Sequence, residues 1–212
     1  MVAVPRSRPR TPPRGLHQST RTRLRGHGSA IGIPSFSDWN NPEPELVLVV
    51  NSTGRIAGAT LGNDVNLRDI EGRSALLLGM AKDNNGSCAV GPFTRLLHDE
   101  FDLDALRREE IVLRIEGEDA HLLESRNSLA AISRTFEDLV AAAYGSHHQH
   151  PDGFALFTGT LFAPTQDRGE KGMGFTHHDG GTVTISSPCL GTLRNTVRPT
   201  DALPPWASAC GR

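Results

Sequence analysis

Two short apolar runs joined by a turn constrain the fold of this chain more than any other feature. Residues 46–50 are an uninterrupted apolar run, residues 56–61 are a second, largely apolar run, and the sequence Asn-Ser-Thr-Gly at 51–54 between them is typical of a turn. This pattern predicts a β-hairpin. The same reasoning predicts strands at 87–97, 110–115, 120–124, 154–158, 182–187 and 192–197.

Helical signals are few. Residues 136–144 are the one convincing helix, because Thr135 can cap its first turn and Gly145 can end it. We also expect a helical turn over residues 66–73. Strands therefore outnumber helices, and we predict a β-rich α+β fold with one or two helices.

The charge of the chain is divided unevenly. Residues 1–28 contain seven arginines, four prolines and no acid, whereas the rest of the chain carries 15 basic and 24 acidic side chains, a net charge of −9. We expect residues 1–28 to be a disordered tail, because they lack large apolar side chains to bury. A targeting peptide, a basic interaction segment and a stretch without a role are the alternatives, and we favour the last. The negative charge of the chain beyond residue 28 would repel a polyanion, so we do not expect nucleic acid as a partner.

The sequence indicates neither a membrane-spanning protein nor a disulfide-stabilised one. The longest apolar stretch, residues 46–50, is far shorter than the roughly 18 residues of a membrane span. The N-terminus lacks the apolar core of a secretory signal, and Cys88, Cys189 and Cys210 show no C-x-x-C spacing. We therefore expect no membrane partner and a cytoplasmic location.

The segment that leads into the hairpin carries two carboxylates. Glu43 and Glu45 point to the same face of an extended chain, and Pro44 keeps the segment extended. Asp64 follows the partner strand, and the return of the chain brings it beside them. Three carboxylates that converge without His or Cys suit a hard divalent cation, Mg²⁺ first and Mn²⁺ or Ca²⁺ next. From spacing alone, an exposed turn is the alternative.

Lys82 is one of only two lysines in a chain that otherwise uses arginine for positive charge. It lies in a polar turn, where a lysine is a compact point charge or proton carrier. A solvated lysine is the alternative.

These residues belong to an ordered set of motifs. The set comprises Glu43-Pro-Glu45, Gly62-Asn-Asp64 followed by Arg68-Asp69, Ala81-Lys82, Gly86-Ser-Cys88 with Gly91-Pro92, Thr158-Gly-Thr160 and Gly191-Thr-Leu-x-Asn195. Over residues 31–206 the chain resembles the C-terminal catalytic domain of the fumarylacetoacetate hydrolase superfamily. In the close placement of its first two motifs, the chain is most similar to members of the bacterial 2-keto-3-deoxy sugar-acid dehydratase branch. The resemblance implies a mixed β-sandwich roll, usually in a homodimer, with residues 207–212 as a second tail.

The resemblance also implies a site and a reaction. Glu43, Glu45 and Asp64 would hold Mg²⁺, or Mn²⁺ or Ca²⁺. Lys82 would be the catalytic residue that neutralises developing negative charge or orients the substrate. Thr160 and Arg68 would bind the substrate together with Lys82. The implied substrate is a 2-oxo acid or β-diketo acid, cleaved by hydrolysis of a C–C bond or dehydrated through a metal-stabilised enolate.

The chain departs from the family at its start. Family members normally carry a longer N-terminal segment with a lid and an acid/base group, which residues 1–28 do not resemble. The chain also ends soon after residue 206, so we expect a fragment or a wrongly started reading frame. A truncated, catalytically inactive remnant that binds a metal or ligand is therefore the second hypothesis. The histidines at 147–150 and 177–178 are expected to be solvated.

Overall fold

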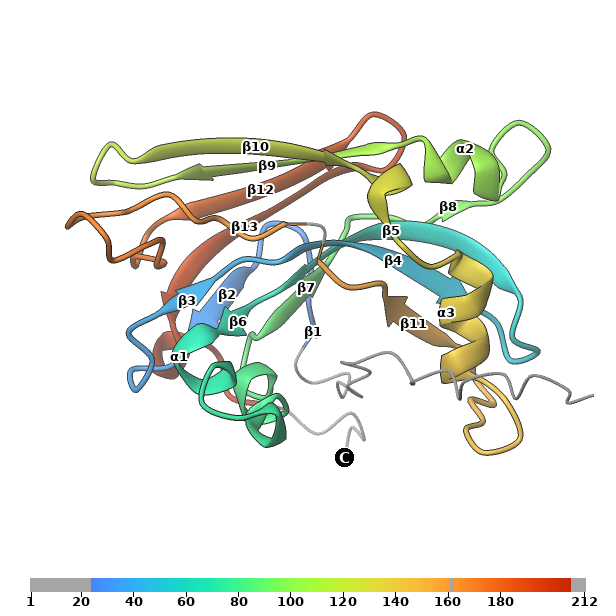
Figure 1. Cartoon of the computed structure of the whole chain (residues 1–212), viewed down its shortest axis with the longest axis horizontal. Coiled ribbons are helices and arrows are strands. Elements are labelled where there is room, and N and C mark those ends of the chain that lie inside the picture. The colour runs from blue at the N-terminus through green and yellow to red at the C-terminus, as the bar shows by residue number, and fades with distance from the viewer. Residues whose placement is uncertain (1–23, 161, 207–212) are drawn as a thin grey trace, which may run out of the picture.

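The computed structural model describes residues 24–160 and 162–206 of the 212-residue chain. Within these residues two curled β-sheets face each other, and short helices lie at their ends (Figure 1). Sheet A has the strand order β1 (Leu24–Arg25), β7 (Cys88–Val90), β5 (Ile56–Asp64), β4 (Pro44–Val50), β11 (Phe154–Phe157), and β8 (Arg95–Leu96) also pairs with β5. Sheet B has the order β10 (Leu122–Ser128), β9 (Glu110–Glu116), β12 (Thr182–Ser187), β13 (Gly191–Pro199), β2 (Ala30–Ile33).

Smaller elements complete the fold. A two-stranded sheet joins β3 (Asn40–Asn41) to β6 (Asn66–Leu67). The α-helices are α1 (Arg68–Glu71), α2 (Leu103–Arg107) and α3 (Phe136–Ala143), and the 3₁₀ turns are η1 (Ala75–Leu77), η2 (Met80–Lys82), η3 (Leu129–Ala131) and η4 (Thr200–Ala202). Most strand pairs are antiparallel, but β1 pairs with β7 and β2 with β13 in parallel. The fold is therefore a β-rich mixed roll, as the sequence predicts.

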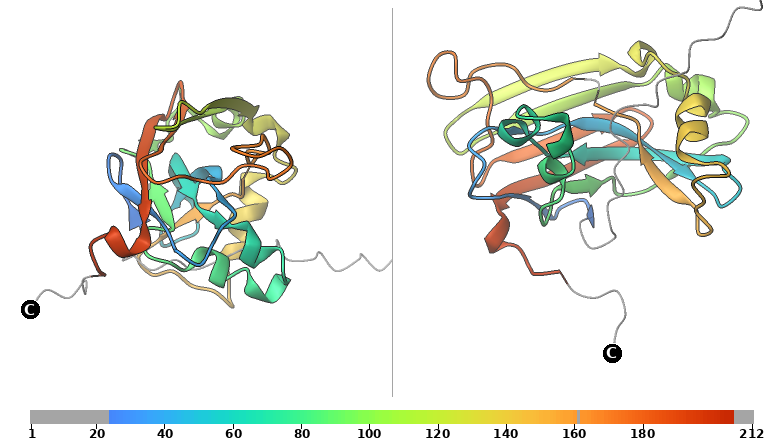
Figure 2. Two further views of the ribbon diagram at one scale, coloured as in Figure 1. Left: turned by 90° about the vertical axis from the view of Figure 1, so that its left-hand side faces the viewer. Right: turned by 60° about the horizontal axis from the view of Figure 1, so that its bottom comes forward.

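Alternation along the strands builds the core between the sheets. In β9 the side chains of Ile111, Leu113 and Ile115 are buried, whereas their neighbours in the strand are partly or fully exposed. Val183 and Ile185 of β12 follow the same two-residue period. Seen end-on, the strands of the two sheets curl around this shared interior (Figure 2).

The helix α3 covers one end of the core. Its N-terminus is capped by Thr135, whose hydroxyl accepts a hydrogen bond from the backbone N–H of Asp138 at 3.1 Å. Phe136, Leu139 and Val140 on its inner face join the main hydrophobic cluster. This helix confirms the prediction over residues 136–144.

The predicted hairpin is present as β4 and β5. The strands pair antiparallel, and the register places Glu45 opposite Gly62. A side chain at position 62 would have no room, because an ideal Cβ there would lie 2.5 Å from Phe157 Cε1 and 2.6 Å from Val47 Cγ2. Close strand packing therefore surrounds the end of the hairpin that carries the acids.

The prediction of one continuous strand over residues 87–97 is wrong. The chain forms β7 and β8 there, and residues 92–94 interrupt the contact with β5 after the Gly91 N–H donates to the backbone oxygen of Leu61. Pro92 lies in the interruption, where it has no N–H to donate to a neighbouring strand.

The helix α2 was not predicted. Its signal is local, since the carboxylate of Asp102 caps it by accepting a hydrogen bond from the N–H of Ala105 at 2.7 Å.

The boundary of the expected N-terminal tail also differs. Leu24 and Arg25 form β1 in sheet A, and the N–H of Gly28 donates to the backbone oxygen of Arg194. Residues 24–28 therefore belong to the fold. The rest of that tail, residues 1–23, and the second expected tail, residues 207–212, lie outside the described residues.

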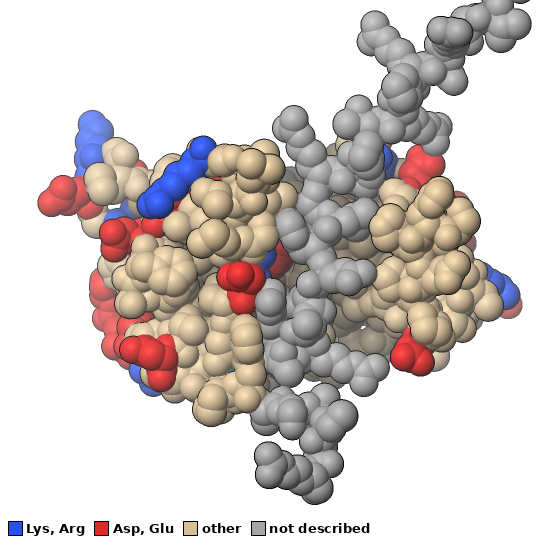
Figure 3. All heavy atoms as spheres, turned by 90° about the horizontal axis from the view of Figure 1, so that it is seen from below, with Lys and Arg blue, Asp and Glu red and all other residues tan. Residues whose placement is uncertain are grey.

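Two surface properties bear on partners. Among the described residues, none of the helices is both long and apolar enough to cross a membrane. On the face seen from below, acidic side chains gather along one side (Figure 3). This agrees with the negative net charge of the chain beyond residue 28.

Candidate active site

Three carboxylates meet where β4 begins and β5 ends. The antiparallel register continues to Glu43 and Asp64, because the N–H of Asp64 donates to the backbone oxygen of Glu43 at 3.0 Å. Glu45 lies two residues further along, on the same face of the strand as Glu43. One carboxylate oxygen from each of Glu43, Glu45 and Asp64 lies within 4.8 Å of the others. The hairpin thus brings together the three residues that the sequence predicts as metal ligands.

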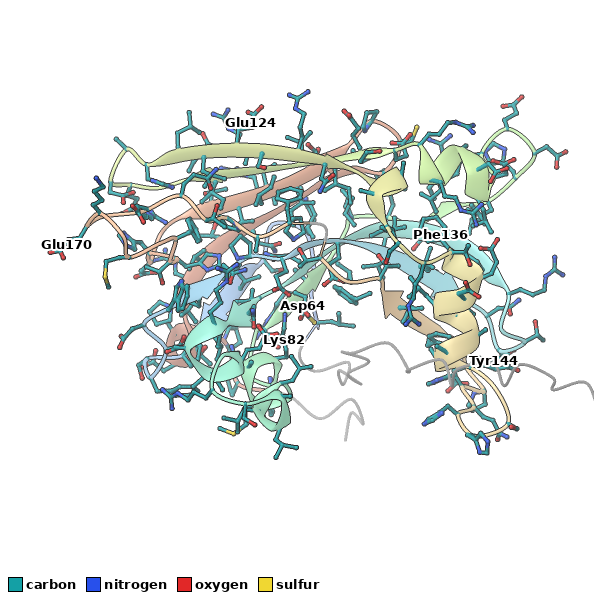
Figure 4. The ribbon with its side chains drawn as sticks, in the orientation of Figure 1. Asp64, Lys82, Glu124, Phe136, Tyr144 and Glu170 are labelled. Atoms are coloured by element: carbon teal, nitrogen blue, oxygen red, sulfur yellow. The ribbon has the colours of Figure 1, made fainter. Side chains whose placement is uncertain are left out.

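Lys82 lies against two of these carboxylates. Its Nζ atom is 2.5 Å from Glu43 Oε2 and 2.8 Å from Asp64 Oδ2, and it donates to the backbone oxygen of Asp64 at 3.2 Å. These three oxygens match the three N–H donors of an ammonium group. Figure 4 shows Asp64 and Lys82 close together, beside the helical segment that contains α1. The sequence places Lys82 in the site, but the alternative of a solvated lysine does not hold, because only 9% of its side chain is exposed.

Burial dominates the electrostatics of Glu43 and Glu45. Burial raises the pKa of Glu43, and the attraction of Lys82 opposes it. Glu45 is only 3% exposed, and burial together with the charge of Asp64 raises its pKa well above the ordinary value. For Lys82, burial works against the charged form, but the attraction of Asp64 and Glu43 outweighs it and raises the pKa. The site therefore favours positive charge at its centre.

The segment that follows β11 supports the acids from the other side. The N–H of Gly159 donates to Glu45 Oε2 at 2.8 Å, and Thr158 donates to the backbone oxygen of Leu46 through both its N–H and its hydroxyl. The hydroxyl of Thr160 is exposed at the end of this segment, 2.8 Å from the backbone oxygen of Phe162 and 3.4 Å from that of Pro44. Thr160 thus lies beside the start of β4.

Arg68 begins the helix α1, four residues after Asp64. Its guanidinium lies over the ring of Trp39, 5.6 Å from the ring centroid. The carboxylate of Asp69, the next residue, accepts hydrogen bonds from the Ser37 hydroxyl and the Asp38 N–H. These contacts tie α1 to residues 37–39.

Comparison with known proteins places this arrangement in a family. The family model described as fumarylacetoacetate (FAA) hydrolase C-terminal matches residues 2–198. The chain belongs to the fumarylacetoacetate hydrolase family. The matched region begins earlier than the 31–206 span of the sequence resemblance and reaches into the expected tail.

Similar family members are sugar-acid dehydratases. A 2-dehydro-3-deoxy-D-arabinonate dehydratase of Saccharolobus solfataricus is 33% identical over 189 residues, which is 88% of this chain and 59% of that protein. A probable 2-keto-3-deoxyxylonate dehydratase of Haloferax volcanii is 32% identical over 185 residues, 87% of this chain and 60% of that protein. The chain therefore spans about three fifths of the length of these relatives.

A solved structure supports the same placement. It is a 2-keto-3-deoxy-D-arabinonate dehydratase complexed with magnesium and 2,5-dioxopentanoate, 32% identical to this chain, with a TM-score of 0.74. The alignment covers 84% of this chain and 59% of that one. The roll predicted from the family resemblance is thus confirmed.

Sequence reasoning missed one acid near the site. Glu71 ends α1, three residues after Arg68, and its Oε2 accepts a hydrogen bond from the Asn66 amide at 2.5 Å. The i, i+3 spacing on a helical turn was the available signal, since it places Arg68 and Glu71 on one face. A small core of Leu67, Ile70 and Ala81 packs this helix against the turn that carries Lys82.

The histidines at 177–178 do not share one environment. His178 is half exposed, but His177 is buried, and its Nδ1 lies 3.1 Å from the Asn40 side-chain oxygen. Burial lowers the pKa of His177 to about 3, so it is neutral at pH 7. The expectation that both are solvated is therefore wrong for His177.

The segment before these histidines is held by a buried arginine. Arg168 donates two hydrogen bonds, of 3.1 and 2.9 Å, to the Asp119 carboxylate, and only 2% of its side chain is exposed. Glu170, two residues on, lies at the outer edge of the molecule, away from Asp64 and Lys82 (Figure 4).

Proposed function

We propose that this chain is a divalent-metal-dependent enzyme that dehydrates a 2-oxo acid of the 2-keto-3-deoxy sugar-acid class. The observation that carries the proposal is the convergence of Glu43, Glu45 and Asp64 beside Lys82. The names of the two similar dehydratases support the reaction, and the magnesium complex of a relative supports the metal. Hydrolytic cleavage of a C–C bond, the other reaction expected of the family, is the alternative.

The donor set fits Mg²⁺. All three acids offer oxygen, with no nitrogen or sulfur ligand among them, and oxygen ligands are what Mg²⁺ prefers. Buried carboxylates with raised pKa values gain more from a cation than exposed ones, because they have lost their hydration. Mn²⁺ and Ca²⁺ share the preference for oxygen and are the alternatives.

Each residue then has a defined task. Glu43, Glu45 and Asp64 would hold the ion, which when bound supplies a Lewis acid for negative charge developing on the keto oxygen. The Gly159 N–H fixes the Glu45 carboxylate. Lys82 limits the repulsion among the acids, and Arg68 and the Thr160 hydroxyl bind the substrate carboxylate.

Magnesium titration by calorimetry tests the metal site. The native chain should bind the ion, and the double variant Glu43→Ala with Glu45→Ala should not. Glu170→Gln is the matched control, because it removes one exposed acid far from the site and should bind like the native chain. Equal binding by the native chain and the double variant would refute the assignment.

Turnover separates the proposal from the inactive remnant. A panel of 2-keto-3-deoxy sugar acids and acylpyruvates is incubated with the protein, with Mg²⁺ or with EDTA. Dehydration that EDTA abolishes supports the enzyme. Magnesium binding without turnover of any member supports the remnant instead. The homodimer and the cytoplasmic location stay predictions.

A further inference from the structure

The pairing of β4 with β5 departs from the regular pattern beside the proposed cation site. In an antiparallel pair, opposite residues that are hydrogen-bonded exchange two bonds, with each N–H donating to the backbone oxygen of the other residue. Since Pro44 lies opposite Asn63, the next opposite pair is Glu43 with Asp64. The Asp64 N–H donates to the Glu43 backbone oxygen at 3.0 Å, but two other bonds replace the reciprocal one.

Asn63 supplies one of the two replacements. Its side-chain Oδ1 atom accepts the hydrogen bond of the Glu43 N–H at 3.2 Å. The backbone oxygen of Asp64 is therefore left for another donor, and it accepts a hydrogen bond from Lys82 Nζ at 3.2 Å. The Asn63 side chain thus stands in for a backbone acceptor, and the Lys82 ammonium stands in for a backbone donor.

The surroundings of Asn63 are unfavourable for an amide. The residue is fully buried, and its Nδ2 atom has no hydrogen-bond partner among the described residues. Burying an amide N–H without an acceptor destabilises a fold, and a leucine would fill nearly the same space without that penalty. The bond to the Glu43 N–H is what an apolar residue of this size could not provide.

We propose that Asn63 is a positioning residue, which interrupts the pairing of Glu43 with Asp64 so that Lys82 gains a backbone acceptor in the site. This rests on the proposed function. Neighbouring side chains of a strand point to opposite faces, so Asn63 acts through the backbone and is not itself a ligand. The Asp64 backbone oxygen is not one of the proposed metal ligands either. It is therefore available to Lys82 whether or not the carboxylates hold a cation.

A double-mutant cycle in EDTA tests this arrangement without metal or substrate. Asn63→Leu removes the acceptor of the Glu43 N–H while Lys82 still competes for the Asp64 backbone oxygen, so the urea midpoint should fall by about 0.5 M. In a Lys82→Met background the Glu43 N–H can form the regular bond to the Asp64 oxygen. The same substitution should then lower the midpoint by less than half as much. Equal shifts in the two backgrounds would overturn the proposal.

Asn195→Leu is the matched control. Asn195 is also buried, with 1% exposed, but its amide donates to the backbone oxygens of Gly26 and Ser29, in the segment that joins β1 to β2. Its effect on the urea midpoint should be the same with Lys82 as with methionine. Coupling as large as that of Asn63→Leu would overturn the proposal. If Asn63→Leu does not fold, Asn63→Ala takes its place in the cycle.

Turnover with saturating Mg²⁺ measures what the placement of Lys82 contributes. Asn63→Leu should lower kcat by about tenfold or more, because small displacements of active-site groups slow reactions strongly. Asn63→Asp keeps an oxygen for the Glu43 N–H, and burial beside three acids favours its neutral form, so kcat should stay within about threefold of the native value. A loss of about tenfold in Asn63→Asp would overturn the role. A native chain without turnover would remove the proposed function, and the cycle in EDTA would still decide the role of Asn63.

Discussion

Replacing Lys82 with methionine tests how strongly the acidic site depends on an internal cation. Methionine keeps most of the side-chain volume but removes the ammonium that contacts Glu43 and Asp64 at 2.5 and 2.8 Å. Removing one partner of a buried ion pair costs about 3–5 kcal/mol. We expect the lower end, about 3 kcal/mol, because 27% of the Asp64 side chain is exposed to solvent.

The measurement is thermal unfolding at pH 7 in EDTA and in excess Mg²⁺. For a domain of this size, a loss of about 3 kcal/mol lowers Tm by about 6–12 °C. Because the pKa of Lys82 is raised, its contribution is present in full below the ordinary lysine value of 10.5 and is lost only as the pH rises through the raised value. The result at pH 7 therefore reports the whole ion pair.

Magnesium should reverse the loss. The ion would supply the positive charge that Lys82→Met removes, so Mg²⁺ should raise the Tm of the variant more than that of the native chain. Adding Glu43→Gln to Lys82→Met should also recover stability in EDTA, because it removes one of the repelling charges. A Lys82→Met variant as stable as the native chain in EDTA would refute the reasoning.

Two other predictions concern charge and pH. Asp119→Asn should lower the free energy of unfolding by about 2 kcal/mol, seen as a lower urea midpoint, because it weakens the pairing of the buried Arg168 guanidinium. Arg168 lowers the pKa of Asp119. The stabilisation by this ion pair should therefore be present above the ordinary pKa of 3.8 and should fade as the pH falls through the lowered pKa. An unchanged midpoint would contradict this. Magnesium affinity should weaken on acidification from about pH 7 to pH 5, since the raised pKa of Glu45 lets protons compete above the ordinary value of 4.5. Calorimetry across this range checks it, and constant affinity would count against Glu45 as a ligand. Because the folded state favours the neutral form of Glu45, the ion-free protein should lose stability as the pH rises through that raised pKa.

Local pattern accounts for the part of the site that sequence reasoning could predict. The hairpin of β4 and β5 follows from two apolar runs and a turn, all within residues 44–64. Once the hairpin forms, Glu43, Glu45 and Asp64 must lie at its open end. The convergence of these three carboxylates thus needs no knowledge of the rest of the chain.

Contacts between distant segments were beyond that reasoning. The contact of Lys82 with Glu43 and the burial of His177 against Asn40 join residues far apart in the sequence. Ala30–Ile33 is a short strand whose partner is β13, near the other end of the described chain. A segment this short cannot show the alternation of apolar and polar residues that would predict such a pairing.

The position of β2 sets an order of events during synthesis. Ala30 pairs with Thr196 and Ile33 with Pro199, so the edge of sheet B closes with one of the first described strands and the last. A nascent chain therefore carries the acidic hairpin of β4 and β5 long before sheet B can cover it. Until β13 leaves the ribosome, β2 has no final partner. Sheet B therefore cannot close before residues 196–199 have been synthesised, and β2 waits for its partner through almost the whole of the described chain.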